Sequence, residues 1–193
     1  MPRTHQATEG ATVSMHAISE KEAYIRHPAV AGLFYPGDAD ELGRMVERFL
    51  DEARTDAPAP KAMIVPHAGY VYSGPIAASA YARLRNREHD IKRVVLLGPA
   101  HRVGFYGVAA SSADYFETPL GRVPLDREAI DRVVALSEVF IFDQAHQQEH
   151  SLEVHLPFLQ ATLGEFKLIP LVVGSGTGEE VVRVIDDLWG GDE

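Results

Sequence analysis

Residues 62–101 read AMIVPHAGYVYSGPIAASAYARLRNREHDIKRVVLLGPAH, and this stretch decides the predicted fold. It contains two short apolar runs, at residues 62–65 and 93–97, of the kind that forms strands buried on both faces of a sheet. A helix is expected between them from Pro75 to Leu84, because proline is favoured at the first position of a helix. A strand, a helix and a strand of these lengths predict a parallel βαβ unit with a right-handed crossover.

The chain on either side of this stretch continues the same pattern. Asp38 and Glu41 have the spacing of a capping box, which predicts the start of an amphipathic helix. The other expected elements are helices over residues 39–54, 126–136, 151–163 (kinked at Pro157) and 177–189, strands over residues 107–112 and 166–173, and an irregular hairpin over residues 115–125. The predicted fold class is therefore α/β, with a mostly parallel central sheet flanked by helices.

The domain boundaries follow from changes in composition along the chain. Residues 1–26 are polar and aperiodic, so we expect a loose N-terminal leader, followed by a single α/β domain over residues 27–193. The last expected helix has no strand after it to which the chain could return. This pattern fits either a sheet that finishes with a terminal helix or a domain that is shortened at its C-terminus.

The overall composition excludes several classes of protein. With 46% hydrophobic and 24% charged residues, the chain has the composition of an ordinary globular protein. The formal net charge of −10 at pH 7 argues against binding to nucleic acid. The sequence has neither an apolar run of about 20 residues nor a secretory signal, so we expect a cytoplasmic protein that does not enter a membrane. Because the chain has no cysteine, a metal site must use imidazole and carboxylate groups.

Two histidines stand in equivalent places in the predicted βαβ unit. His67 and His101 each follow the carboxyl end of a predicted strand. Ligands of α/β sheets bind at this edge, so the two imidazoles are placed to reach one cation through bonds of about 2.0–2.1 Å. The alternative is that each imidazole only forms hydrogen bonds with loop backbone.

Residues 143–155, DQAHQQEHSLEVH, concentrate histidines and acids in a predicted loop that leads into a helix. His150 lies beside Glu149 and Glu153, so a carboxylate is available to hold its tautomer for acid–base chemistry. The alternative is a solvated charge cluster. His155 lies on an apolar stripe of the helix and is expected to point inward. It is either part of the site or a core histidine that forms a hydrogen bond with a backbone carbonyl.

Four segments of the chain together carry a family resemblance. They are residues 28–36 (PAVAGLFYP), 65–74 (VPHAGYVYSG), 97–101 (LGPAH) and 149–158 (EHSLEVHLPF). In this order they resemble the Memo-like family, known in bacteria as AmmeMemoRadiSam system protein B. The resemblance implies a fold similar to that of class III extradiol dioxygenases, which bind a non-haem iron at the end of a mostly parallel sheet.

The resemblance also implies roles for individual residues. His67 and His101 would be the imidazole metal ligands, and His150 would be the acid/base histidine beside the metal. His155 would be a catalytic residue together with His150. Both His155 and Glu153 would support the site without binding the metal. Iron is the metal implied by the analogy with dioxygenases, although two imidazoles also suit copper or zinc.

One part of the family pattern is absent from this chain. In the family, a further strand near the C-terminus supplies the third metal ligand, and the present sequence stops before that strand. We therefore expect residues 27–193 to be a Memo-like domain that lacks its C-terminal strands. A carboxylate such as Glu153, or another subunit, would then have to complete the site.

The sequence leaves more than one function open. The leading hypothesis is a dioxygenase-like, metal-dependent oxidoreductase of unknown substrate in which His150 moves a proton. The alternatives are a non-catalytic module that binds a peptide or a partner protein in the histidine-lined cleft, and a metal-dependent hydrolase. The ligand expected in this cleft is a small molecule or a peptide. A homo-oligomer is also open. Aromatic contacts to a bound peptide are expected from Tyr70, Tyr72, Phe105, Tyr106 and Phe158.

Overall fold

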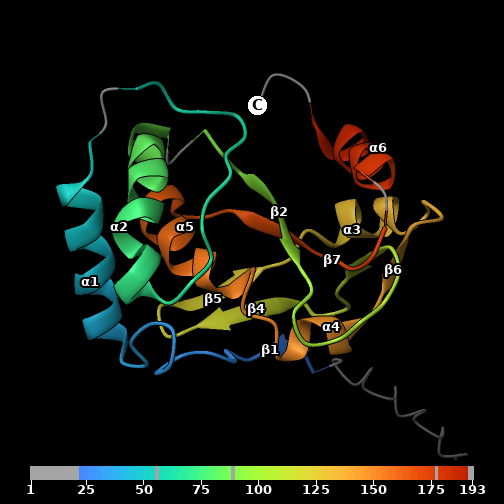
Figure 1. Cartoon of the computed structure of the whole chain (residues 1–193), viewed down its shortest axis with the longest axis horizontal. Helices are drawn as coiled ribbons and strands as arrows, with labels where there is room; N and C mark the ends of the chain where they lie inside the picture. The colour runs from blue at the N-terminus through green and yellow to red at the C-terminus, as the bar shows by residue number, and fades with distance from the viewer. Residues whose placement is uncertain (1–21, 55–56, 88–89, 177, 191–193) are drawn as a thin grey trace, which may run out of the picture.

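The computed structural model describes residues 22–54, 57–87, 90–176 and 178–190. These residues form two β-sheets with helices packed around them (Figure 1), which confirms the predicted α/β class. The larger sheet has the strand order β2 (Arg93–Pro99), β7 (Lys167–Val173), β3 (Val108–Ala110) and β6 (Val139–Ile141). The smaller sheet has the order β1 (Ile25–Arg26), β4 (Tyr115–Thr118) and β5 (Gly121–Pro124), in which β4 and β5 are the predicted hairpin.

The larger sheet is mixed rather than purely parallel. Strands β2 and β7 run parallel, as do β3 and β6, whereas β3 and β7 run antiparallel. Residues 100–107, which join β2 to β3, are too few for the crossover of a dozen or more residues that a parallel return needs. The chain therefore turns back after β2.

The strand predicted at residues 62–65 is wrong, because these residues belong to no strand in the described part of the chain. Met63 and Val65 are half-buried against the core, whereas the side chain of Ile64 is fully exposed. An apolar run that packs on one side only looks like a buried strand in sequence, and periodicity does not separate the two. The predicted βαβ unit does not form, and β2 lies at an edge of its sheet.

The amphipathic helix predicted after Asp38 is confirmed as α1 (Ala39–Glu52). The Oδ1 atom of Asp38 accepts a hydrogen bond from the backbone N–H of Glu41 at 2.9 Å, as the capping-box spacing predicts. The buried side chains of this helix are Leu42, Val46 and Leu50. The apolar stripe read from the sequence is therefore the face that packs against the core.

The next helix, α2 (Tyr70–Tyr81), begins earlier than the sequence predicts, so Pro75 lies inside it rather than at its first position. Its N-terminus is held by a distant loop, because the backbone N–H of Tyr70 donates to the carbonyl oxygen of Phe34 at 2.7 Å. This long-range contact has no local sequence signal. As a result, α2 starts directly after the segment that carries His67.

The other helices are η1 (Ala82–Arg87), α3 (Arg127–Val133), α4 (Asp143–Gln147), η2 (Glu153–His155), α5 (Leu156–Leu163) and α6 (Gly178–Leu188). Helix α4 occupies a stretch that was expected to be a loop, and the single helix predicted from Ser151 divides into the 3₁₀ turn η2 and α5. Pro157 causes no kink, because it lies in the first turn of α5, where its missing N–H costs no helical hydrogen bond. Thr177, the predicted cap of α6, lies outside the described residues.

The helices form two groups around the larger sheet (Figure 1). Helices α1, α2 and α5 pack on one another on one side of β2, whereas α3 packs against α6 and β7. Tyr81 and Phe158 stack with ring centroids 5.2 Å apart and are among the largest fully buried side chains. None of the helices in the described ranges combines the length and the apolar character that crossing a membrane requires.

The predicted leader needs a correction at its end. Residues 1–21 lie outside the described residues, but Ile25–Arg26 forms β1, which pairs in parallel with β4. Arg26 is buried, and its guanidinium donates hydrogen bonds to the backbone oxygens of His146 and Glu149. Two residues are too short for any periodicity to show, so the sequence pattern did not reveal this strand.

A buried carboxylate, that of Glu153, ties this N-terminal segment to η2. It forms an ion pair with Arg26 and accepts hydrogen bonds from the backbone N–H groups of Ala29 and Val30 at 2.8 and 3.0 Å. The hydroxyl of Tyr35 donates to the same carboxylate at 2.5 Å. A buried ion pair with all its groups satisfied contributes little net stability, but loss of one partner leaves an uncompensated charge in the interior.

We therefore expect Glu153→Gln to destabilise the fold by about 3–5 kcal/mol, because the charge of Arg26 would stay buried without its counter-ion. The measurement is the free energy of unfolding from urea titration. Glu52→Gln, on the exposed side of α1, is the control and should change this free energy by less than about 0.5 kcal/mol. Equal stabilities of the two variants would contradict the role given to Glu153.

Candidate metal site

Three histidines from distant parts of the chain lie together. His67, His101 and His150 each offer one ring nitrogen, and these nitrogens all lie within 4.8 Å of one another. The ring centroids are 5.3 Å apart for His67 and His101, 5.9 Å for His67 and His150, and 4.6 Å for His101 and His150. The structure thus joins the two predicted metal ligands with the predicted acid/base histidine. We call these three residues the histidine cluster.

His67 reaches the cluster by a route that differs from the predicted one. The segment before it is not a strand, so its position does not come from neighbouring parallel strands. Instead, the segment is held at the start of α2, where the hydroxyl of Ser73 donates to the carbonyl oxygen of Ala68 at 2.8 Å. The helix therefore takes the place of the sheet in positioning His67.

His101 follows β2 as predicted, and Glu149 holds it from the opposite loop. The Oε1 atom of Glu149 accepts a hydrogen bond from Nδ1 of His101 at 2.8 Å, and Oε2 accepts one from the backbone N–H of His101 at 2.6 Å. Burial alone would raise the pKa of Glu149, but the hydrogen bonds from His101 and Ser151 outweigh it and lower this pKa to about 2. The carboxylate is therefore ionised at neutral pH.

The loop that carries His150 is fastened to the end of β2. The hydroxyl of Ser151 donates to the carbonyl oxygen of Pro99 at 2.9 Å. Gly98 permits this approach, because a Cβ atom there would lie 2.7 Å from Oγ of Ser151 and 2.8 Å from Cδ2 of Leu152. The glycine in the strand end is thus a packing requirement of the site.

The imidazoles of His67 and His150 are held in the neutral form. Burial, followed by the neighbouring imidazole of His101, lowers the pKa of His67. Burial also lowers the pKa of His150 and outweighs the opposing effect of Glu149. The Nδ1 atom of His150 is buried, lies 3.3 Å from Oε1 of Glu149 and forms no hydrogen bond with the described residues. Neutral imidazoles present the lone pairs that a metal ion needs.

The donor set of the cluster fits a divalent transition metal. Imidazole nitrogen suits zinc, copper, iron and nickel, and a metal–nitrogen bond of about 2.0–2.1 Å brings two ligand atoms to roughly 3–3.5 Å from each other. Ring nitrogens within 4.8 Å need only small side-chain movements to reach that spacing. The residues present therefore fit the metal ion that the sequence predicts, without choosing its identity.

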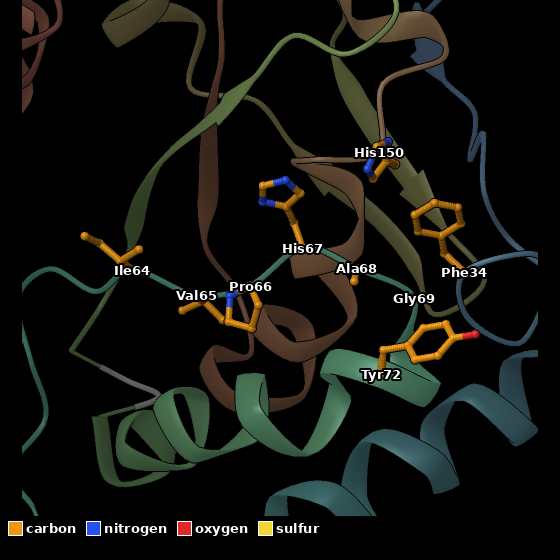
Figure 2. Close-up of a pocket in the computed structure, with 9 residues that line it drawn as sticks. All are labelled: Phe34, Ile64, Val65, Pro66, His67, Ala68, Gly69, Tyr72 and His150. Carbon is orange, nitrogen blue, oxygen red and sulfur yellow. The ribbon is translucent and has the colours of Figure 1, made fainter.

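An open hollow of about 860 Å³ lies beside the cluster (Figure 2). Its lining consists of Phe34, Ile64, Val65, Pro66, His67, Ala68, Gly69, Tyr72 and His150. The rings of Phe34 and His150 lie next to each other, with centroids 4.7 Å apart (Figure 2). Most of the lining is apolar, and two cluster histidines supply polar nitrogens, which is the usual character of a small-molecule site.

His155 lies in the core rather than in the cluster. It is 5% exposed, and its Nδ1 atom forms a hydrogen bond of 2.9 Å with the hydroxyl of Tyr81. Burial, followed by the neighbouring imidazole of His67, lowers the pKa of His155 to about 4. The inward orientation expected from the apolar stripe is observed, with a tyrosine hydroxyl as the partner instead of a backbone carbonyl. The catalytic role of His155 stays a prediction.

Glu153 does not complete the ligand set. Its carboxylate binds Arg26, Tyr35 and the N-terminal backbone, so it is unavailable to an ion at the cluster. The acid that contacts the cluster is Glu149. The sequence placed Glu149 beside His150, but only the folded chain reveals that it binds His101 as well.

Of the aromatic residues predicted to contact a peptide, one lines the hollow. Tyr72 is 83% exposed there. Tyr70 and Phe158 are buried in the core, Phe105 packs edge-on against Phe142, and Tyr106 donates a hydrogen bond to Glu180. The prediction is wrong for Tyr70 and Phe158, because the helices that carry them turn both side chains toward the core.

This protein is a mixed α/β domain in which three histidines gather beside the end of β2. The family model described as Memo-like protein matches residues 26–188. A MEMO1 family protein of Aquifex aeolicus is 42% identical over 150 residues, which cover 77% of this chain and 55% of that protein. One of Sulfolobus acidocaldarius is 40% identical over 180 residues, covering 86% of this chain and 63% of that protein. The chain therefore belongs to the Memo-like family, and it spans little more than half the length of these curated relatives.

The burial of His146 and His155 makes the free energy of unfolding depend on pH. Burial lowers the pKa values of His146 and His155 from 6.5 to about 4, so the folded protein binds fewer protons than the unfolded chain between these limits. The free energy of unfolding should be highest above pH 6.5 and should decrease by roughly 3 kcal/mol per histidine as the pH falls to about 4. Urea titrations across this range provide the measurement.

His146→Asn should reduce the slope of that pH dependence, and His27→Asn, at an exposed position, is the matched control. The slope is compared rather than the absolute stability, because His146 also donates a hydrogen bond to the backbone oxygen of Ala109. A stability that is flat between pH 6.5 and 4 would contradict the buried neutral state of both histidines.

Proposed function

We propose that this domain carries the metal centre of a dioxygenase-like, metal-dependent oxidoreductase. His67 and His101 are the metal ligands, and His150 transfers a proton beside them. The observation that supports this proposal most directly is the spacing of the three ring nitrogens, all within 4.8 Å. Membership of the Memo-like family and the resemblance to class III extradiol dioxygenases favour iron as the metal, and copper and zinc also suit imidazole ligands.

A divalent iron ion bound here would supply Lewis acidity and a site at which dioxygen and substrate are activated together. The protein contributes the rest. Glu149 holds His101, and α2 holds the segment of His67. His150 is neutral at pH 7 because burial lowers its pKa, so one of its ring nitrogens is free to accept a proton from a substrate hydroxyl.

The size and lining of the hollow favour a small aromatic substrate of the catechol type. Its volume of about 860 Å³ is in the usual range for ligand pockets. Phe34 and Tyr72 offer ring faces, and Ile64 and Pro66 extend the apolar lining. His150 stands at the edge of this lining, where it would meet the polar end of such a molecule.

Metal binding is tested by elemental analysis of protein purified without a histidine tag. We expect about one transition-metal ion per chain in the wild type and its loss in the double variant His67→Ala, His101→Ala, because a single imidazole binds such ions weakly. His27→Ala removes an exposed histidine that is not part of the cluster and should retain the metal. Metal-free wild-type protein that cannot be reloaded would contradict the proposed function.

The role of His150 is tested by oxygen uptake with catechols in iron-loaded protein. His150→Gln should keep its iron and lose about 10²–10⁴-fold in rate, the usual contribution of a general acid or base. Loss of the iron itself would instead make His150 a third ligand and overturn the proton-transfer assignment. Release of acid from ester or amide substrates without oxygen uptake would favour a hydrolase.

A peptide-binding module is the second candidate, because apolar side chains next to the hollow are exposed. Ile64 is fully exposed, Tyr72 is 83% exposed and Val71 is 79% exposed. Protein that contains no metal but captures an apolar peptide, and loses it on Tyr72→Ala, would favour this candidate over the oxidoreductase.

A further inference from the structure

A buried carboxylate faces the histidine cluster without belonging to it. Glu149 is 2% exposed, and its Oε1 atom faces two imidazoles, with Nδ1 of His101 at 2.8 Å and Nδ1 of His150 at 3.3 Å. This differs from Glu153 on the same segment, whose counter-ion is the guanidinium of Arg26. Burial of an ionised carboxylate costs several kcal/mol unless its oxygens are satisfied. The role of the buried Glu149 can therefore be inferred from its hydrogen-bond partners.

The carboxylate of Glu149 joins the two loops that carry His101 and His150. On one side, it accepts hydrogen bonds from the backbone N–H and the Nδ1–H of His101 at 2.6 and 2.8 Å. On the other side, Oε1 accepts from the backbone N–H groups of His150 and Ser151, both at 2.9 Å. Oε1, the oxygen 3.3 Å from Nδ1 of His150, already accepts three hydrogen bonds, which explains why this Nδ1 is left without a partner.

The bond to His101 also decides which of its ring nitrogens is free. An ionised carboxylate only accepts hydrogen bonds, so the hydrogen in the 2.8 Å contact belongs to Nδ1 of His101. The neutral ring then has its lone pair on Nε2. Hydrogen bonds of this kind fix the tautomer and orientation of metal-bound histidines and increase the basicity of the free nitrogen.

The charge of Glu149 also favours a metal ion at the histidine cluster. Imidazole binds metal ions in its neutral form, so a divalent cation among His67, His101 and His150 would bring two positive charges into a site partly shielded from water. Glu149 supplies one negative charge directly behind His101. A nearby anion of this kind increases the affinity of an imidazole site for a cation.

From these contacts we infer that Glu149 is the positioning residue of the metal site: it holds His101 in the Nδ1–H tautomer, with Nε2 free for the ion, and it sets the spacing between His101 and His150. This inference rests on the proposed metal-binding function. No metal bond to Glu149 itself is involved, because its oxygens are occupied by N–H donors.

The test uses Glu149→Gln, in which one carboxylate oxygen becomes an NH₂ donor that faces another N–H group. The Kd for Zn²⁺ is measured by competition with a chromophoric chelator, and the tautomer of His101 is read from ¹⁵N chemical shifts of the metal-free protein. We expect Zn²⁺ to bind about 10–100-fold more weakly in the variant, the usual effect of removing such a partner. We also expect the Nδ1–H tautomer of His101 to lose its dominance.

Asp143→Asn, at the start of the same acid-rich segment, is the matched control. The carboxylate of Asp143 accepts hydrogen bonds from Ser111 and Ser112 rather than from the cluster, so this variant changes a carboxylate without touching Glu149. The affinity for Zn²⁺ and the tautomer of His101 should stay close to those of the wild type. An equal loss of affinity in both variants would mean that Glu149 acts only through loop stability and would overturn the inference.

The two measurements separate this inference from the proposed function. Wild-type protein that binds no Zn²⁺ would contradict the proposed function, while the tautomer of His101 would still test the positioning by Glu149. An Nε2–H tautomer of His101 in the wild type would overturn the inference even if the Gln variant does not fold. An unchanged tautomer and an unchanged Kd in Glu149→Gln would do the same.

Discussion

The ion pair between Arg26 and Glu153 joins the start of the described chain to the segment that carries His150, and the rest of the structure depends on it. Arg26 also donates hydrogen bonds to the backbone oxygens of His146 and Glu149, so one guanidinium anchors both ends of the loop before His150. Glu153 in turn holds the backbone of Ala29 and Val30. Because a buried charge tolerates no loss of its partners, these contacts form together or not at all.

A second buried carboxylate, that of Glu149, connects this loop to His101. Glu149 and Glu153 lie close together on one segment, yet they serve different purposes, because one faces imidazoles and the other faces a guanidinium. The end of β2 supplies His101 and, at Gly98, the space for Ser151 to approach. The segment before α2 supplies His67 and much of the lining of the hollow. The cluster is therefore a meeting point of one strand end, one helix start and one loop, all fixed by buried polar contacts.

Much of the fold was predictable from local patterns, and the errors have physical causes. The cap at Asp38, the apolar stripe of α1, the hairpin of β4 and β5 and the buried run of β7 were all read correctly, because they depend on periodicity and capping within a few residues. Residues 62–65 misled the prediction, because an apolar segment packed on one face has the same pattern as a buried strand. Strands β1 and β6, of two and three residues, were missed, because segments this short carry little periodicity.

The sequence by itself determined which residues could carry chemistry: with no cysteine in the chain, the histidines that follow apolar runs and the acid-rich stretch before α5 were the available ligands. Only the tertiary structure decided how they meet. It placed His67 through α2 rather than through a strand, paired the inward-pointing His155 with Tyr81, and assigned Glu153 to Arg26 and Glu149 to His101. The reason is that a hydrogen bond between residues far apart in the chain depends on packing, and side-chain type alone does not specify which buried carboxylate faces which partner.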